Sequence, residues 1–230
     1  MTLQALSLKN GLIDWAKVDT VLLDMDGTLL DLHFDNYFWQ SHLPNHYAQK
    51  HKVDVLQAKA LLEPRMAREE GTLNWYCLDF WSRELGVDII TLKREVSHLI
   101  RPHTYALRFL RALRAAKKDV WLVTNAHSDS VNLKLEHTPL ASWLNRIVTS
   151  HTMGFPKEKA EFWSALQVAH PFEKMRALMV DDNISVLRAA RTYGIAQLLC
   201  IVKPSSAAPA IPVTEFQNLH GFDELLAHDA

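Results

Sequence analysis

The sequence predicts an α/β fold, a parallel β-sheet with a helical module inserted after its first strand. Short apolar runs rich in β-branched residues recur along the chain with helix-like stretches between them, which is typical of a parallel sheet. Residues 31–103 differ, because they carry helical patterns and no convincing strand pattern. These two observations place most of the chain in one sheet-based unit and the remainder in an insertion.

Five strands are predicted from the apolar runs. In the first run Val21, Leu22 and Leu23 are consecutive, as expected for a strand that is buried on both faces. The five runs are Val18–Met25, Val120–Val123, Ile147–Thr149, Ala177–Val180 and Leu198–Val202. Helical periodicity between the later runs predicts helices at Ser128–His137, Lys157–Ala169 and Ile184–Tyr193, with Gly194 as the C-terminal cap of the last.

The insertion divides the chain into residues 1–30 with 104–230, which form the core, and residues 31–103. A crossover between parallel strands needs only about a dozen residues or slightly more, so this much longer segment is expected to form a module over one end of the sheet. Its aromatic residues fall at helical spacing, and we expect them to pack the interior of the module rather than stack on a substrate. They are Phe34, Tyr37, Phe38, Trp39, Trp75, Tyr76, Phe80 and Trp81.

Composition and charge exclude several classes of function. The chain has 230 residues, of which 48% are hydrophobic and 22% charged, and its formal net charge is -1. This balance is typical of a soluble globular protein and gives no basic surface for a nucleic acid polymer. No apolar run is long enough to span a bilayer and no signal peptide is evident, so we expect a cytoplasmic protein without a membrane partner. The sequence carries no signal for an oligomeric state.

Cysteine and histidine usage gives no sign of a disulfide framework or a structural zinc site. The two cysteines, Cys77 and Cys200, are far apart and neither belongs to a Cys-x-x-Cys pair. The twelve histidines are scattered and match no metal-binding motif.

Two aspartates, Asp24 and Asp26, stand where the first strand ends, and Gly27 then allows a sharp turn. Ligands of open α/β sheets bind beyond the carboxyl ends of the strands, so both carboxylates can reach one site if the strand breaks at Met25. Asp24 would then attack phosphorus, and Asp26 would protonate the leaving oxygen and activate the hydrolytic water. The alternative is a plain turn, since Asp-Gly is common in turns.

Polar residues also follow the second and third predicted strands. Thr124 and Asn125 can hold phosphate oxygens through a hydroxyl and a backbone N–H, although, taken alone, a helix-capping turn is the favoured explanation of them. Lys157 is predicted in the first turn of a helix, where the helix dipole disfavours a cation, so we expect its charge to balance carboxylates and phosphate.

The fourth strand ends in two adjacent acids, Asp181 and Asp182, followed by Asn183. Adjacent carboxylates at a buried strand end repel one another unless a cation is present, and hard oxygen ligands suit Mg²⁺. The alternative is that Asp182 or Asn183 only caps the following helix. The order of the four elements, each after its own strand, favours a phosphate-handling site.

In this order the four elements resemble the motifs of the haloacid dehalogenase-like (HAD) superfamily, and the resemblance covers the whole chain. It implies a Rossmann-like three-layer core with a five-stranded parallel sheet and an α-helical cap at residues 31–103. It also implies Mg²⁺ held by the Asp24 carboxylate, the Asp26 backbone carbonyl and Asp182, while Asp181 supports Lys157, although the two acids could exchange roles. The supporting residues are Thr28, Asp181 and Asn183.

Four stretches look like the bacterial GMP/IMP 5′-nucleotidases of this superfamily, namely residues 24–40, 72–82, 134–138 and 154–158. The likeness implies that purine 5′-mononucleotides are hydrolysed to nucleoside and phosphate through an aspartyl-phosphate. The alternatives are a phosphatase for a sugar phosphate or phosphoglycolate and a phosphomutase with the same nucleophile. A binding module with a degenerate site is disfavoured because every expected chemical group is present.

Within residues 31–103 the candidates for substrate contact are weak, and for each a structural role is favoured over base recognition. They are Asp31, Asn36, Trp39, Asn74 and Trp75.

Overall fold

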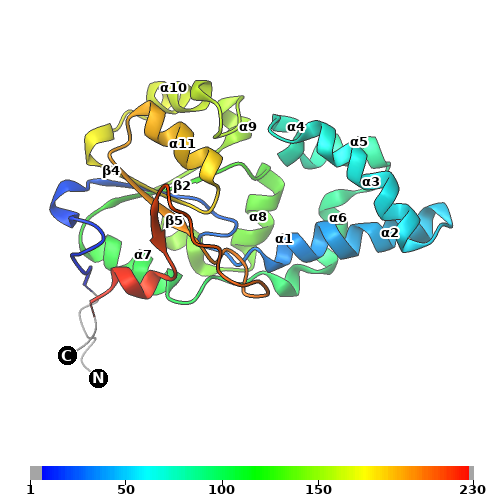
Figure 1. Cartoon of the computed structure of the whole chain (residues 1–230), viewed down its shortest axis with the longest axis horizontal. Coiled ribbons are helices and arrows are strands. Elements are labelled where there is room, and N and C mark those ends of the chain that lie inside the picture. Colours follow the sequence, from blue (N-terminus) through cyan, green and yellow to red (C-terminus); the bar gives the residue numbers. More distant parts are fainter. Residues whose placement is uncertain (1–6, 228–230) are drawn as a thin grey trace.

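The computed structural model describes residues 7–227, and it has an α/β architecture around one parallel sheet (Figure 1). Every strand pairs in parallel with its neighbours, in the order β3-β2-β1-β4-β5-β6. The strands are β1 Thr20–Leu23, β2 Asp119–Thr124, β3 Arg146–Thr149, β4 Ala177–Asp181, β5 Gln197–Ile201 and β6 Gln217–Leu219. The α/β class and the first five strands are confirmed. The sheet has a sixth strand, β6, so the prediction of five strands is wrong by one. The sequence did not indicate β6 because this strand is short and opens with polar residues.

Helices cover both faces of the sheet. Within β1, Val21 and Leu23 belong to the apolar cluster that contains α7 (Ala106–Ala115) and α8 (Ser128–Glu136). Leu22 belongs to the opposite cluster, with α10 (Ala160–Ala169) and α11 (Ile184–Tyr193), because successive side chains of a strand point to opposite faces. Figure 1 shows α10 and α11 on one side of the strands and α7 on the other. The result is three layers.

The helix predicted at Lys157–Ala169 begins later, at Ala160, so the prediction that Lys157 lies in its first turn is wrong. The Lys157 backbone N–H donates to Asn125 Oδ1 at 2.9 Å, and the Trp163 indole N–H donates to the Lys157 carbonyl at 2.8 Å. These bonds hold Lys157 in a turn before the helix, so the argument from the helix dipole does not apply. In contrast, α11 has the predicted bounds and ends at Gly194 in a left-handed conformation.

Residues 31–103, which we call the helical insertion, contain helices and no strand, and they lie to one side of the sheet (Figure 1). Its elements are α1 His33–Tyr37, a π-helix at Phe38–His42, α2 Leu43–His51, α3 Val55–Glu69, α4 Leu73–Tyr76, α5 Leu78–Leu85, α6 Ile89–Glu95 and a 3₁₀ turn at Ser97–Leu99. Of its aromatic residues, Phe34, Phe38 and Trp81 are buried in the apolar core. Trp39 and Trp75 also border a cavity, so the expected packing role describes only part of the set.

The remaining elements are short. They are 3₁₀ turns at Trp15–Lys17, Pro139–Trp143, Lys174–Arg176 and Phe222–Leu225, and helix α9 at Ser150–Met153. Among residues 7–227, no helix combines the length and the apolar character needed to cross a membrane. The first six residues, on which the expectation about a signal peptide partly rests, lie outside the described part.

Candidate active site

The carboxyl ends of β1, β2 and β4 bring the predicted core residues together around Lys157. The Lys157 ammonium donates to Asp24 Oδ1 at 2.5 Å, to Asp181 Oδ2 at 2.7 Å and to the Val123 carbonyl at 3.0 Å. The side chain of Lys157 is only 2% exposed. A buried cation thus holds two carboxylates from neighbouring strands in fixed positions.

Three carboxylates meet at this point, since oxygens of Asp24, Asp181 and Asp182 lie within 4.8 Å of one another. Burial raises the pKa of Asp24 to about 6, aided by Asp181 and opposed by Lys157. Burial, with Asp181 and Asp24, also raises the pKa of Asp182 well above its ordinary value. Three acids face one ammonium, so when ionised the cluster has an excess of negative charge.

The donor set at this cluster fits a hard divalent cation, which prefers carboxylate and carbonyl oxygen. The backbone leaves room for it. Gly27 has a φ of +81°, and a Cβ there would lie 2.5 Å from Asp182 Oδ2. Only glycine therefore allows the Asp182 carboxylate to approach the loop that follows Asp24.

Three of the residues predicted to bind phosphate or to support the site, Thr124, Asn125 and Asn183, have well-defined partners. Asn125 donates from Nδ2 to Glu158 Oε2 at 2.9 Å, and Thr124 Oγ1 accepts the Ala126 N–H at 3.1 Å. Asn183 caps α11, since its Oδ1 accepts the Ser185 N–H at 2.8 Å. The capping alternative is therefore a real interaction for Asn183, whereas Thr124 stabilises a turn and α8 is capped by His127.

Thr28 is fully buried, and its hydroxyl has no hydrogen-bond partner within the described part of the chain.

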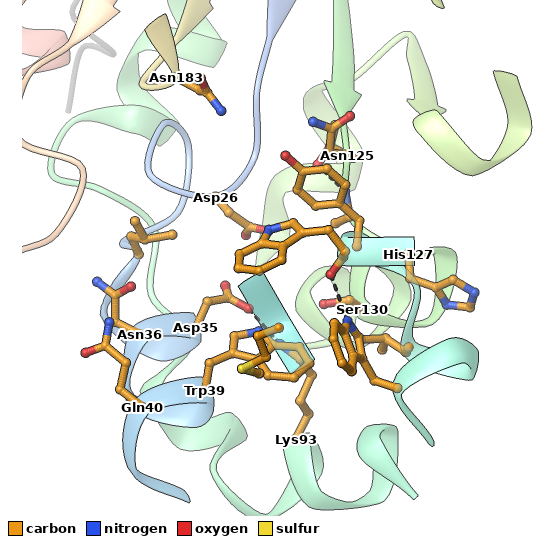
Figure 2. A pocket seen from close by; sticks show the side chains of 18 of the residues that line it. Asp26, Asp35, Asn36, Trp39, Gln40, Lys93, Asn125, His127, Ser130 and Asn183 are labelled. Carbon is orange, nitrogen blue, oxygen red and sulfur yellow. Dashed lines mark hydrogen bonds and ion pairs between the residues drawn. The ribbon is translucent and has the colours of Figure 1, made fainter. Parts of the chain in front are cut away.

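Asp26 belongs to a second buried charge network that the sequence did not indicate. Lys134 of α8 donates to Asp26 Oδ1 at 2.6 Å and to Asp35 Oδ2 at 2.7 Å, and Lys93 of α6 donates to Asp35 Oδ1 at 2.6 Å. Both lysines are 1% exposed. Figure 2 shows Asp26, Asp35 and Lys93 along one wall of the cavity. The network therefore connects Asp26 to two helices of the insertion, α1 and α6.

The two carboxylates of this network differ in proton affinity. Burial raises the pKa of Asp26 to about 6 against the opposing effect of Lys134. Burial acts in the same direction on Asp35, but Lys134 and Lys93 outweigh it and lower the pKa of Asp35 to about 2. Asp26 is thus the group of this network that can exchange a proton near neutral pH.

A cavity of about 740 Å³ lies between these charged groups and the helical insertion. Its apolar wall includes Trp39, Met66 and Trp75, and its polar lining includes Asn36 and Gln40. Figure 2 shows the two amides on the same side of the cavity. The combination of stacking surfaces and a few polar groups suits a small aromatic ligand that carries a charged end.

The weak candidates of the insertion divide into two groups. Asn36, Trp39 and Trp75 border the cavity, whereas Asp31 and Asn74 are not among its lining residues. Asp31 accepts the backbone N–H groups of His33 and Ser206, and Asn74 donates to Glu69 at 3.1 Å. Asp31 and Asn74 therefore have structural partners.

We expect Lys134→Met to lower kcat roughly 10²- to 10⁴-fold, the range for loss of effective acid–base catalysis. Lys134 lowers the pKa of Asp26, so its removal raises that pKa above about 6 and moves the acid limb of the kcat–pH profile to higher pH. The profile of phosphate release against pH measures both effects.

Lys93→Met is the matched control, because Lys93 shares Asp35 with Lys134 but does not contact Asp26. Its acid limb should move much less than that of Lys134→Met, because Lys93 acts on Asp26 only through its charge at a distance. An equal displacement of the limb in both variants would show that Lys134 acts on Asp26 only through the fold.

Comparison with known proteins shows the family of the chain. The family model for haloacid dehalogenase-like hydrolases matches residues 18–194. The GMP/IMP nucleotidase YrfG of Escherichia coli (strain K12) is 39% identical over 214 residues, which cover 93% of this chain and 96% of the relative, and the YrfG protein of Shigella flexneri matches equally.

Solved structures share the fold. An HAD phosphatase from Thermococcus onnurineus superimposes with a TM-score of 0.75 at 18% identity, covering 90% of this chain and 95% of that one. The putative HAD-hydrolase YfnB from Bacillus subtilis, described as bound to magnesium, has a TM-score of 0.62 at 16% identity and covers 90% and 96% of the two chains.

Proposed function

The chain belongs to the haloacid dehalogenase-like hydrolases, and we propose that within this family it is a Mg²⁺-dependent phosphoric monoester hydrolase with Asp24 as nucleophile. One observation carries the proposal. The Asp24 carboxylate is fixed on Lys157 at 2.5 Å, beside Asp182 and at the wall of the cavity. Asp26, the second acid of the strand end, borders the same cavity.

In the proposed reaction an Asp24 oxygen attacks phosphorus, and the bond from phosphorus to the ester oxygen breaks. Asp26 gives its proton to that departing oxygen. Asp26 then takes a proton from water, which attacks the aspartyl-phosphate, releases inorganic phosphate and restores the Asp24 carboxylate. A pKa of about 6 lets Asp26 serve in both steps near neutral pH. Lys157 and the Thr124–Asn125 loop would hold the phosphate oxygens.

Mg²⁺ would be held by Asp24, Asp182 and the Asp26 backbone carbonyl, and it would neutralise charge on the phosphoryl oxygens. The excess of carboxylates over ammonium groups at this point supports the assignment. Asp181 would orient Lys157, to which it is bonded at 2.7 Å.

We propose purine 5′-mononucleotides as substrates and the helical insertion as the cap that encloses them. The 39% identical relative is a GMP/IMP nucleotidase. Trp39 and Trp75 offer flat surfaces for a base, and the amides of Asn36 and Gln40 offer both donors and acceptors to its edge.

Phosphate release from a panel of phosphorylated metabolites with Mg²⁺ tests this assignment. We expect kcat/KM for GMP and IMP to exceed that for sugar phosphates and phosphoglycolate at least tenfold, because only the nucleotides fill the aromatic wall. Release without a bisphosphate activator would separate hydrolysis from phosphomutase chemistry. Efficient turnover of a sugar phosphate with little response to GMP or IMP would reject the purine assignment and leave the mechanism intact.

A further inference from the structure

Three metal-ligating side chains, remote in sequence, meet where the helical insertion contacts the strand ends. They are Cys77, the N-cap of α5, His127, the N-cap of α8, and His151 of α9. One ligand atom of each lies within 4.8 Å of the other two. The two imidazole rings are perpendicular, with centroids 4.8 Å apart. Figure 2 shows the His127 ring pointing away from Asp26 and Asp35, so this cluster is separate from the network of Asp26.

One ring nitrogen of His151, the buried Nε2, has no hydrogen-bond partner within residues 7–227. Its Nδ1 lies 3.5 Å from Ser150 Oγ, which itself donates to the Asn125 carbonyl and can therefore accept Nδ1–H. Burial, with a contribution from His127, lowers the pKa of His151 to about 4, so the ring is neutral at physiological pH. A neutral imidazole with an unprotonated, unpartnered nitrogen is suited to bind a metal.

His127 and Cys77 complete the ligand set. His127 Nδ1 accepts the Asp129 backbone N–H at 3.4 Å and lies 3.6 Å from Asp129 Oδ2, and Nε2 lies 3.8 Å from Asp79 Oδ2. Binding of a metal through Nε2 would place the ring proton on Nδ1, where the Asp129 carboxylate is near enough to replace that capping bond as its partner. The Cys77 sulfur accepts the Phe80 N–H at 3.4 Å. One sulfur and two imidazole nitrogens, with a carboxylate nearby, match the ligand preferences of zinc.

We propose that Cys77, His127 and His151 form a second metal site, for a thiophilic divalent cation such as Zn²⁺, which joins the helical insertion to the strand ends. Sulfur and nitrogen ligands distinguish it from the all-oxygen cluster of Asp24, Asp181 and Asp182. On binding, the Cys77 S–H bond breaks, a sulfur–metal bond forms and the proton leaves to solvent. Asp79 lies beside this set, with Oδ2 3.8 Å from His127 Nε2, and a water molecule could take the fourth position.

The geometry predicts a consequence for turnover. Zinc–ligand bonds of about 2.0–2.3 Å place ligand atoms roughly 3.3–3.8 Å apart, which the 4.8 Å upper limit of this cluster allows. A bound cation would therefore tie α5 to α8 and α9. Because the cavity lies between the insertion and the strand ends, a bound cation would restrain the insertion and slow exchange of substrate and product.

Titration of the full chain with Zn²⁺ by calorimetry, at saturating Mg²⁺, tests the site directly. We expect one equivalent to bind, and Co²⁺ in its place to give a thiolate-to-metal charge-transfer absorption. Cys77→Ser should weaken binding at least tenfold and abolish that absorption. Serine is a preferred N-cap residue, so this variant keeps the start of α5 intact.

Cys200→Ala is the matched control, because it removes the other thiol, which is buried elsewhere, and should bind Zn²⁺ as the wild type does. His151→Asn should weaken binding as Cys77→Ser does. Inhibition by Zn²⁺ at saturating Mg²⁺ should disappear in Cys77→Ser, whose activity without Zn²⁺ should stay at the wild-type level. Failure to bind one equivalent at micromolar protein, or binding and inhibition unchanged in Cys77→Ser, would overturn the proposal.

Discussion

Asp24→Asn is expected to release no phosphate above background, a loss of at least about 10⁴-fold, as found when a covalent nucleophile is removed. The amide keeps the shape of the side chain, but it cannot form the acyl-phosphate. It also gives Lys157 a neutral partner in place of the carboxylate that it contacts at 2.5 Å. The measurement is phosphate release from GMP at saturating Mg²⁺.

Thermal unfolding of the same variant separates lost chemistry from lost fold. The variant loses the buried ion pair with Lys157 but also relieves the repulsion between Asp24 and Asp182, so we expect a lower Tm and a protein that is still folded at the assay temperature. Acid quenching of the wild type during turnover should trap a phosphorylated chain, which the variant should not yield. Substantial activity in a folded Asp24→Asn protein would refute the covalent mechanism.

The sequence predicted the core of the candidate site because its geometry follows from the fold class. In a parallel sheet the carboxyl ends of the strands share one edge, so residues after β1, β2 and β4 must meet wherever they stand in the chain. Lys157 shows how far this argument extends. Its presence beside the carboxylates was anticipated, but its place before α10 depends on bonds to Asn125 and Trp163 that no periodicity reveals.

The network around Asp26 could not be predicted in the same way. Lys134 and Asp26 are 108 positions apart, and Lys93 and Asp35 are 58 apart. Their contacts depend on how the helices of the insertion pack against α8, and helix packing is decided by tertiary fit rather than by a shared edge. The only signal was that Lys134 begins one of the four stretches resembling the nucleotidases.

The sequence did not indicate the cluster of Cys77, His127 and His151 either, because its contacts also depend on helix packing. The expectation that the chain has no structural zinc site was therefore based on motifs alone. Sequence motifs for zinc rely on ligands that are close along the chain, whereas these three come from the starts of separate helices. Cys77 belongs to the insertion and the two histidines follow β2 and β3. Only the packing of the insertion brings them together.

Chelation with EDTA is expected to abolish phosphate release, and added Mg²⁺ to restore it. Without the cation, Asp24, Asp181 and Asp182 face the single ammonium of Lys157, and no other cationic side chain of the described residues forms an ion pair with them. A phosphoryl group brought to this cluster would add further negative charge, so turnover should require the metal. Full activity in the chelated protein would refute the metal assignment.

Two isosteric variants test which acid binds Mg²⁺ and which acid orients Lys157. Asp182→Asn should raise the Mg²⁺ concentration for half-maximal activity at least about tenfold, since loss of even an indirect metal contact costs that much. It should leave the Tm unchanged or higher, because Asp182 makes no ion pair with Lys157. Asp181→Asn should lower the Tm and leave the Mg²⁺ requirement near the wild-type value. It breaks a fully buried pair with Lys157 at 2.7 Å, a change that typically costs about 3–5 kcal/mol of stability. If Asp181→Asn shifted the Mg²⁺ requirement and Asp182→Asn did not, the two acids would have exchanged roles, and Gly27 would serve a purpose other than admitting Asp182 to the metal.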